Sequence, residues 1–358
     1  EWLASDDWKR IRKRARRARQ RLAAAPPRPR RLYVLHHSGG GTPETNRDLM
    51  TALSPDQDSL LLLAHTAGAD LYRIGIGRDR IVESWITETP FTISDTWRPD
   101  FAAFIARVLA EHAIELIHIR HLINQPLTTI PTVARLMQIP FVLSTHDFYY
   151  ICPSVNLLDG NLSHCGGECT PGTSRCFAPN AFVRGAANLK HDWVHVWRRH
   201  AAQVLDAADA IVVTTPSAEA IYRRNYPAFA TKLVQIEHGR DFGPEWVHIR
   251  SAPADRRPGP LRVLCAANWA PHKGIAFISE LVAATSDVVE WHFAGRRSEL
   301  ITGSAVHHGE YARDAFPTVT ASIDPDFIGL FSIWPETYSH TLSEAWALGI
   351  EVLATDLG

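Results

Sequence analysis

The sequence lacks any apolar run near the ~20 residues of a membrane-spanning helix, and no signal-peptide pattern opens it. These absences favour a soluble, cytoplasmic protein. The chain also lacks internal repeats, low-complexity tracts and the G-x-G-x-x-G fingerprint of dinucleotide-binding proteins. Its 358 residues, 46% hydrophobic and 21% charged, are enough for two globular domains. Because the first residue is Glu1 and not Met, we expect other domains of a longer protein as partners.

A net charge of only −1 hides an uneven distribution. Residues 1–30 hold 11 of the 37 Lys and Arg residues but only 3 of the 38 Asp and Glu residues, so the remainder is acidic. The basic stretch at residues 9–21 predicts a helical arm that is basic on nearly every face. A solvated linker helix, an arm on an anionic lipid surface and a nucleic-acid contact are the competing interpretations. An acidic body behind one basic arm is a poor nucleic-acid binder, so nucleic acid is not expected as a partner.

Beyond a Pro-rich break at residues 25–30, short apolar runs alternate with helical patterns. Runs of this kind indicate parallel sheets that are covered on both faces by helices. A second Pro-rich linker, residues 251–260, separates two Rossmann-like domains, residues 31–250 and 259–358, whose sheets are expected to face a cleft. The expected strands are 31–37, 59–65, 114–120, 140–145, 210–215 and 232–238 in the first domain, and 261–267, 288–295, 327–332 and 350–355 in the second.

Two motifs of the first domain follow expected strands. Gly39, Gly40 and Gly41 come directly after the first strand, where backbone N–H groups at a helix start can approach an anion closely. A tight turn without a ligand explains these glycines equally well. His146 stands at the carboxyl end of a buried strand, the edge that faces the cleft in a parallel sheet. The alternative for His146 is a histidine that only caps backbone groups.

The second domain carries the strongest motif, "SIWPETYSHTLSEAWALG" at residues 332–349. It predicts a strand that gives way to a helix with Ser339 or Thr341 near its start, which points free N–H groups and a positive dipole end at the cleft. Glu336 precedes this helix and Glu344 lies inside it, and buried carboxylates need hydroxyl partners such as those of a ribose or a hexose. Lys273, in a Lys-Gly turn after the domain's first strand, is placed to neutralise a phosphate, although such turns are common on surfaces.

Taken together, these motifs resemble glycosyltransferase family four over residues 31–358. The resemblance implies a retaining GT-B-fold enzyme that uses a nucleotide-sugar donor and needs no cofactor for catalysis. The segments "HIRHLINQPL", "STHDFYYICPSVNLLDG" and "PHKG" look most like the branch that makes bacterial O-antigens, lipopolysaccharide and related surface polysaccharides. That branch implies transfer of a hexose or deoxyhexose to a glycan or lipid-linked saccharide acceptor. It also implies a peripheral position on the inner face of the cytoplasmic membrane.

The resemblance assigns roles to the motif residues. Glu336 would contact the transferred sugar near its anomeric centre, Glu344 the ribose, Lys273 the diphosphate and His146 the donor sugar. Because the family's fold continues past the point where this sequence stops, we expect an incomplete second domain. The other implied donor-binding positions are Gly39, Gly40 and Gly41, Asn268 where many members have Arg, and His340, Thr341 and Leu342 at the helix start.

Four of the five cysteines, Cys152, Cys165, Cys169 and Cys176, fall in one loop. Their spacing is not a standard zinc-ribbon pattern, but four thiolates suffice for a tetrahedral structural zinc site. Free thiols are supported equally well, and disulfides least, because the expected compartment is reducing.

Two other functions compete with sugar transfer. One is an inactive GT-B module that serves as a scaffold in a larger polysaccharide-assembly protein. The other is a different GT-B activity, such as that of a phosphorylase or an epimerase. Intact Glu336, Glu344, Lys273 and His146 argue against the scaffold.

Overall fold

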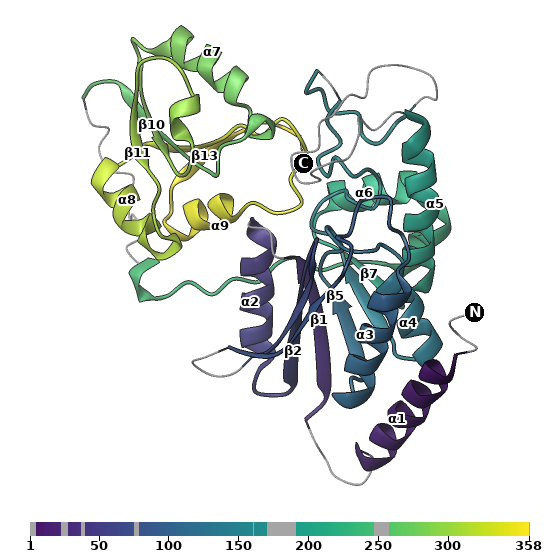
Figure 1. The fold of residues 1–358 in the computed structure, drawn as a ribbon. Helices are drawn as coiled ribbons and strands as arrows, with labels where there is room; N and C mark the ends of the chain where they lie inside the picture. The colour runs from purple at the N-terminus through teal and green to yellow at the C-terminus, as the bar shows by residue number, and fades with distance from the viewer. Residues whose placement is uncertain are drawn as a thin grey trace. The chain divides into compact units, whose positions relative to one another are not determined.

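The computed structural model describes residues 5–22, 28–36, 40–74, 79–159, 161–169, 191–246 and 258–357. The chain divides into two compact α/β units, which Figure 1 shows in one view. The first unit ends at Gly239, and the second comprises residues 240–358 together with the short segment 161–164. The boundary therefore comes before the linker expected at 251–260, of which residues 251–257 lie outside the described part.

The first unit is built on an eight-stranded sheet in the order β4-β3-β2-β1-β5-β6-β7-β8. The strands from β2 through β1 to β8 pair in parallel, as the apolar runs predict, whereas β2, β3 and β4 form an antiparallel extension. The strands are β1 (Arg30–His36), β2 (Asp58–His65), β3 (Gly68–Arg73), β4 (Arg80–Ile86), β5 (Leu116–Ile119), β6 (Phe141–Ser144), β7 (Ala210–Val213) and β8 (Leu233–Gln235).

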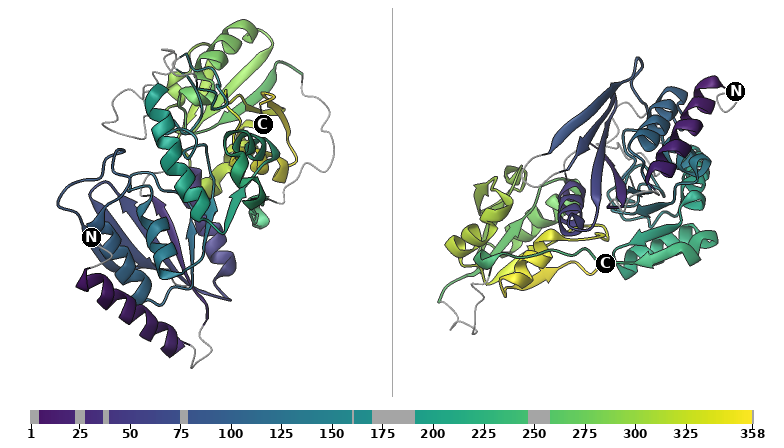
Figure 2. Two further views of the ribbon diagram at one scale, coloured as in Figure 1. Left: turned by 90° about the vertical axis from the view of Figure 1, so that its right-hand side faces the viewer. Right: turned by 90° about the horizontal axis from the view of Figure 1, so that it is seen from below.

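Helices cover both faces of this sheet. In Figure 2, α2 lies on one face and α3, α4 and α5 lie on the other. The helix α2 connects β1 to β2, whereas α4 and α5 connect strands that follow one another in the opposite direction across the sheet. Because such crossovers are right-handed, the two directions place their helices on opposite faces. The carboxyl ends of β1, β5 and β6 therefore meet at one edge, where polar side chains gather. The helices of the unit are α1 (Asp6–Leu22), α2 (Gly41–Leu53), α3 (Pro99–Glu111), α4 (Thr129–Met137), α5 (His191–Ala207) and α6 (Pro216–Asn225).

The basic N-terminal stretch lies in α1, which packs along α3 (Figure 1). Trp8, only 4% exposed, and Ile11 form its buried edge. Arg14 Nη1 donates a hydrogen bond to Glu111 Oε1 at the end of α3, over 3.3 Å. Trp8 and Ile11 thus attach α1 to the first unit, and the basic side chains of α1 whose exposure is described are all exposed: Lys9, Arg10, Arg12, Lys13, Arg14, Arg16 and Arg17.

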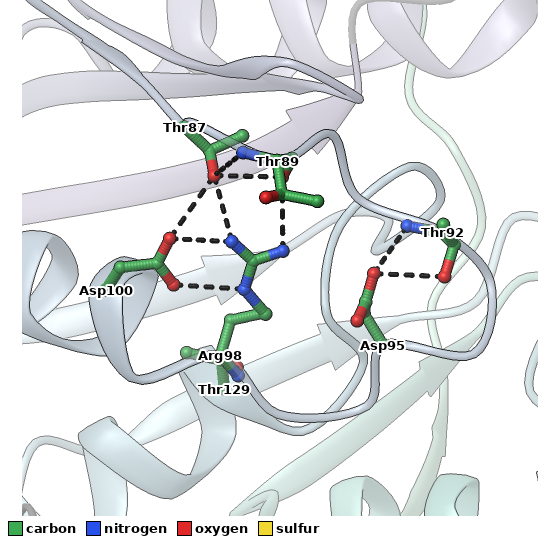
Figure 3. Close-up of polar contacts among 7 residues, drawn as sticks. All are labelled: Thr87, Thr89, Thr92, Asp95, Arg98, Asp100 and Thr129. Carbon is green, nitrogen blue, oxygen red and sulfur yellow. Dashed lines mark hydrogen bonds and ion pairs between the residues drawn. The ribbon is translucent and has the colours of Figure 1, made fainter.

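A polar cluster around Arg98 fixes the start of α3 (Figure 3). The guanidinium donates to both carboxylate oxygens of Asp100 (3.1 and 2.7 Å), to Thr87 Oγ1 (2.9 Å) and to the carbonyl oxygen of Thr89 (3.1 Å). The backbone N–H of Arg98 donates to Thr129 Oγ1 at the start of α4 (3.1 Å). Burial raises the pKa of Asp100, but the hydrogen bonds from Arg98 and the helix backbone outweigh it and hold that pKa below its usual value. The cluster joins the segment after β4 to two helices of the first unit.

The second unit has a five-stranded parallel sheet in the order β11-β10-β9-β12-β13. Side chains of its central strand alternate between two cores, because successive residues of a strand face opposite sides. Val263 and Cys265 pack with α7, whereas Leu264 and Ala266 pack with α8 and α9. The elements are β9 (Leu261–Ala266), α7 (Ile275–Thr285), β10 (Val289–Ala294), β11 (Ala305–Gly309), α8 (Phe316–Ile323), β12 (Phe327–Leu330), α9 (His340–Ala347) and β13 (Glu351–Ala354).

The prediction of two α/β units with largely parallel sheets is thereby confirmed. Within the described part of the chain, the helices are all too short or too polar to cross a lipid bilayer.

Candidate active site

The helix α9 starts just beyond the carboxyl end of β12. Ser339 is its N-cap and accepts a hydrogen bond on Oγ from the Leu342 N–H, over 3.3 Å, so one of the two predicted caps is confirmed. Thr341 Oγ1 donates to the carbonyl oxygen of Ala266, over 3.2 Å, and so ties the helix start to the end of β9. His340, Thr341 and Leu342 were expected at the helix start, and the N–H group of Leu342 is the one that donates to the cap.

Lys273 and Glu336 form an ion pair in front of this helix. Lys273 ends a short 3₁₀ turn after β9 (Pro271–Lys273), and the Ser332 hydroxyl also donates to Glu336 Oε1. The Ile333 N–H donates to the carbonyl oxygen of His272, over 3.1 Å, which joins the two loops. Two residues 63 positions apart in the sequence are thus brought into contact at the edge where the strands end.

Gly274 holds the backbone of this turn in place. Its φ of +79° is left-handed, and a Cβ at this position would lie 2.2 Å from the carbonyl oxygen of Phe331. Only glycine fits such an approach. The neighbouring His272 is kept neutral, because burial and then the Lys273 charge lower its pKa to about 4 against the opposing effect of Glu336. Lys273 and Glu336 are consequently the charged pair of this loop.

Glu344 lies one turn into α9 and is paired with Arg240, which sequence reasoning missed. The Arg240 and Glu344 side chains are 8% and 6% exposed. Burial raises the pKa of Glu344, and the hydrogen bond and charge of Arg240 oppose that effect. Each carboxylate of the motif therefore has its own cation, and a positive helix end lies between them.

His146 belongs to a polar cluster at the carboxyl edge of the first unit's sheet. Its ring stacks on that of His238, with centroids 5.1 Å apart. Burial, and then the charge of Arg120, keeps the pKa of His146 well below its usual value. Close by, His121 Nε2 and Asp147 Oδ2 are 2.9 Å apart. Sequence reasoning placed His146 at this edge but missed His121 and His238.

The other predicted donor-binding residues that the structure describes lie at the start of α2, after β9 and at the start of α9. Gly40 and Gly41 stand at the start of α2, while Gly39 lies outside the described residues. Asn268 is exposed directly after β9. His340 opens α9 and its ring packs edge-on against Tyr338, with centroids 4.9 Å apart.

The cysteine loop gathers three described thiols near Arg198 of α5. Arg198 Nη2 donates to Cys169 Sγ (3.4 Å). Burial raises the pKa of Cys152 and Cys165, and hydrogen bonds from Ser154 and the Gly167 backbone oppose that effect. All three thiols are free, and Cys176 lies outside the described residues. No group of three or more metal-ligating side chains occurs among the residues that the structure describes.

The four-cysteine zinc site stays a prediction. If the site exists, protein purified without a chelator is expected to carry about one zinc ion per chain, with zinc–sulfur distances of ~2.3 Å. Elemental analysis and zinc-edge X-ray absorption measure both quantities. A metal-free chain with four titratable thiols in this loop would show that the cysteines are simply reduced.

In fold, the chain is similar to several solved glycosyltransferases. A glycosyltransferase from Rickettsia africae ESF-5 is 13% identical and has a TM-score of 0.57, covering 92% of this chain and 80% of that chain. Anabaena Alr3699/HepE in complex with UDP is 14% identical with a TM-score of 0.54, covering 92% and 81%. The lipopolysaccharide outer core galactosyltransferase WaaB is 13% identical with a TM-score of 0.50, covering 91% and 81%. These likenesses show the fold.

The family follows from the sequence itself. Residues 39–244, more than half of the chain, match Glycosyltransferase Family 4, and the chain belongs to that family. A comparison with curated protein sequences finds no match.

Proposed function

We propose that the protein transfers a sugar from a nucleotide-sugar donor to a saccharide acceptor with retention of anomeric configuration. The Lys273–Glu336 ion pair in front of the start of α9 carries this proposal. It places one cation and one carboxylate together beside a positive helix end, as a diphosphate joined to a sugar requires. The relative Alr3699/HepE has been seen with UDP and with UDP-glucose, which supports a nucleotide sugar as donor.

In the proposed reaction, the bond between the anomeric carbon and the diphosphate oxygen breaks while a bond to the acceptor oxygen forms. Lys273 and the α9 N-terminus stabilise the negative charge that develops on the departing diphosphate. The acceptor attacks from the face that the diphosphate leaves, and a phosphate oxygen takes the acceptor proton. Glu336 accepts hydrogen bonds from Lys273 and Ser332, which makes it a poor covalent nucleophile and suits it to holding the sugar.

The roles of the other site residues are proposals of the same kind. Glu344 holds the ribose, Asn268 and the first turn of α9 line the diphosphate, and His146 contacts the donor sugar. Gly39, Gly40 and Gly41 line the phosphate and acceptor side. We propose a glycan or lipid-linked saccharide of bacterial surface polysaccharide as acceptor, which the similarity to the lipopolysaccharide outer core enzyme WaaB supports.

The experiment that tests the function is a transfer assay with a panel of nucleotide sugars and oligosaccharide or polyprenyl-linked acceptors. Product analysis by NMR gives the anomeric configuration. A product with the donor's configuration and release of the nucleoside diphosphate are expected. Inversion would contradict the retaining mechanism. An inactive scaffold would bind no nucleotide, a phosphorylase would require inorganic phosphate, and an epimerase would alter the donor without an acceptor.

We further propose that α1 docks the protein on an anionic membrane surface. Packing through Trp8 and Ile11 leaves Lys13, Arg16 and Arg17 exposed, whereas the chain beyond residue 30 carries an excess of negative charge. Each Lys or Arg near such a surface contributes on the order of 1 kcal/mol, and salt weakens the contribution.

Changing Lys13, Arg16 and Arg17 together to Glu is expected to weaken binding to vesicles of phosphatidylglycerol and phosphatidylcholine by on the order of a hundredfold. Co-sedimentation at low and high salt measures the effect. The matched control changes three exposed arginines elsewhere in the first unit, Arg47, Arg80 and Arg135, to Glu. An equal loss in both variants would mean that net charge alone governs binding, and no binding by the wild type would refute docking.

A further inference from the structure

A buried ion pair joins the segment after β8 to the middle of the motif helix. Arg240 Nη1 donates to Glu344 Oε1, and the two residues are 104 positions apart in the sequence. Both belong to the second unit. Among the described residues, each side chain has the other as its only hydrogen-bond partner, and Glu344 Oε2 accepts none. One carboxylate oxygen is therefore occupied and the other is available.

Two aromatic rings hold the Arg240 guanidinium in position. Its central carbon lies 4.8 Å from the Phe242 ring centroid and 5.0 Å from that of Trp246. Trp246 is buried in the same core as Ala345 of α9, and its ring stacks on Phe316 of α8. The arginine is thus anchored through its neighbours to the core beneath the helix that carries Glu344.

The surroundings of Glu344 make this cation necessary. A carboxylate removed from water is costly unless a charge or a hydrogen bond compensates for the loss of hydration. Among the described residues, the charged and titratable groups that act on it are Arg240, Arg313 and Tyr311. Arg240 contributes both a hydrogen bond and charge, whereas Arg313 acts through charge alone and Tyr311 is neutral because burial raises its pKa. Of the two arginines that counter the effect of burial on the Glu344 carboxyl, Arg240 has the larger effect.

We infer that Arg240 is a positioning residue for donor binding, which keeps Glu344 a carboxylate and leaves its second oxygen to accept a ribose hydroxyl. The inference rests on the proposed function, in which Glu344 holds the ribose. Arg240 acts through Glu344 and does not itself touch the donor. A donor whose ribose lacks one of the two hydroxyls therefore benefits less from Arg240.

The test measures donor affinity in Arg240→Met, Glu344→Gln and the double variant. Calorimetry with UDP-glucose, GDP-mannose and ADP-glucose first identifies which of them the wild type binds most tightly. These ligands are diphosphate diesters that do not titrate near neutral pH. Arg240→Met is expected to weaken binding on the order of tenfold, as Glu344→Gln does. In the double variant, loss of Arg240 adds nothing further, because its effect passes through the carboxylate.

A pH profile separates this role from a merely structural one. Affinity needs the carboxylate, so it falls as the pH drops through the pKa of Glu344. Removing the neighbouring cation raises that pKa, and the midpoint of the profile moves to higher pH in Arg240→Met. Glu344→Gln lacks this transition. Arg240→Met should also narrow the preference for the ribonucleotide over its 2′-deoxy analogue.

Two variants control for folding. Arg296→Met removes an exposed arginine of the same unit, paired with Glu310 over 3.5 Å, and should leave affinity unchanged. Arg240→Lys keeps a cation and remains informative where Arg240→Met does not fold; it should weaken binding less and shift the profile less.

Three results would separate the inference from the proposed function. Unchanged affinity and an unchanged pH profile in Arg240→Met, with Glu344→Gln impaired, would overturn the inference and leave the proposed function standing. A further loss in the double variant would show that Arg240 contacts the donor directly, which also overturns it. No binding of any nucleotide sugar by the wild type would overturn the proposed function and the inference with it.

Discussion

Replacing Lys273 with Met is expected to slow sugar transfer by about 100- to 1,000-fold. Lys273 reaches the front of α9 from the turn after β9, and its charge is the one best placed to meet the departing diphosphate. Asn268, exposed in the same stretch, supplies no second cation. The loss falls mainly on turnover, because the charge on the leaving oxygen grows as the bond to the sugar breaks.

Steady-state rates with saturating donor measure this loss, and melting temperatures exclude unfolding. Lys273→Arg retains a positive charge and should recover part of the rate, whereas Arg296→Met removes an exposed charge of the same unit and should behave like the wild type. A Lys273→Met enzyme that turns over normally would refute the assignment of the leaving-group site.

Changing Glu336 to Gln is expected to reduce turnover by about 100-fold while the affinity for free nucleoside diphosphate stays the same or rises. Glu336 forms an ion pair with Lys273, so its removal leaves the lysine charge free for the diphosphate. The transferred sugar, in contrast, would lose the carboxylate that we propose lies near its reacting carbon. Glu344→Gln should show the opposite pattern, with weaker nucleotide binding.

Paired measurements of diphosphate affinity and transfer rate distinguish the two glutamates. Ser332→Ala is the matched control for the surroundings of Glu336, since it removes one hydrogen bond to the same oxygen and keeps the charge pair. Weaker diphosphate binding in Glu336→Gln, with an unchanged rate at saturation, would assign Glu336 to the nucleotide and contradict its proposed role.

The parallel core of both sheets was predictable because fully buried strands are continuous apolar runs, as in β1 and β9. The antiparallel pair β3 and β4 was missed because its strands mix polar and apolar residues. Ile81, Val82 and Ile86 of the edge strand β4 are exposed. β11, an edge strand of the second sheet, was missed because nearly all of its residues are exposed. Edge strands carry no burial pattern strong enough to be recognised alone.

The site was predictable where its residues share a local motif and unpredictable where they meet only in three dimensions. Ser339, Glu336 and Glu344 belong to one short segment, and the cap and the two carboxylates could be placed from the order of strand, turn and helix. Arg240 belongs to a distant segment that resembles an ordinary strand exit. Nothing in its local pattern shows that it folds back against α9.

If α1 docks on a membrane surface as proposed, its attachment to α3 also determines how freely the protein can turn there. A basic segment on a flexible tether would leave the first unit to tumble through every orientation while bound. Here Trp8 and Ile11 fix the helix against α3, so its basic side chains keep one direction relative to the sheet beneath. A surface that binds α1 would therefore hold the first unit at one tilt. At each encounter with a lipid-linked acceptor, the first unit would then already have a nearly fixed orientation relative to the membrane.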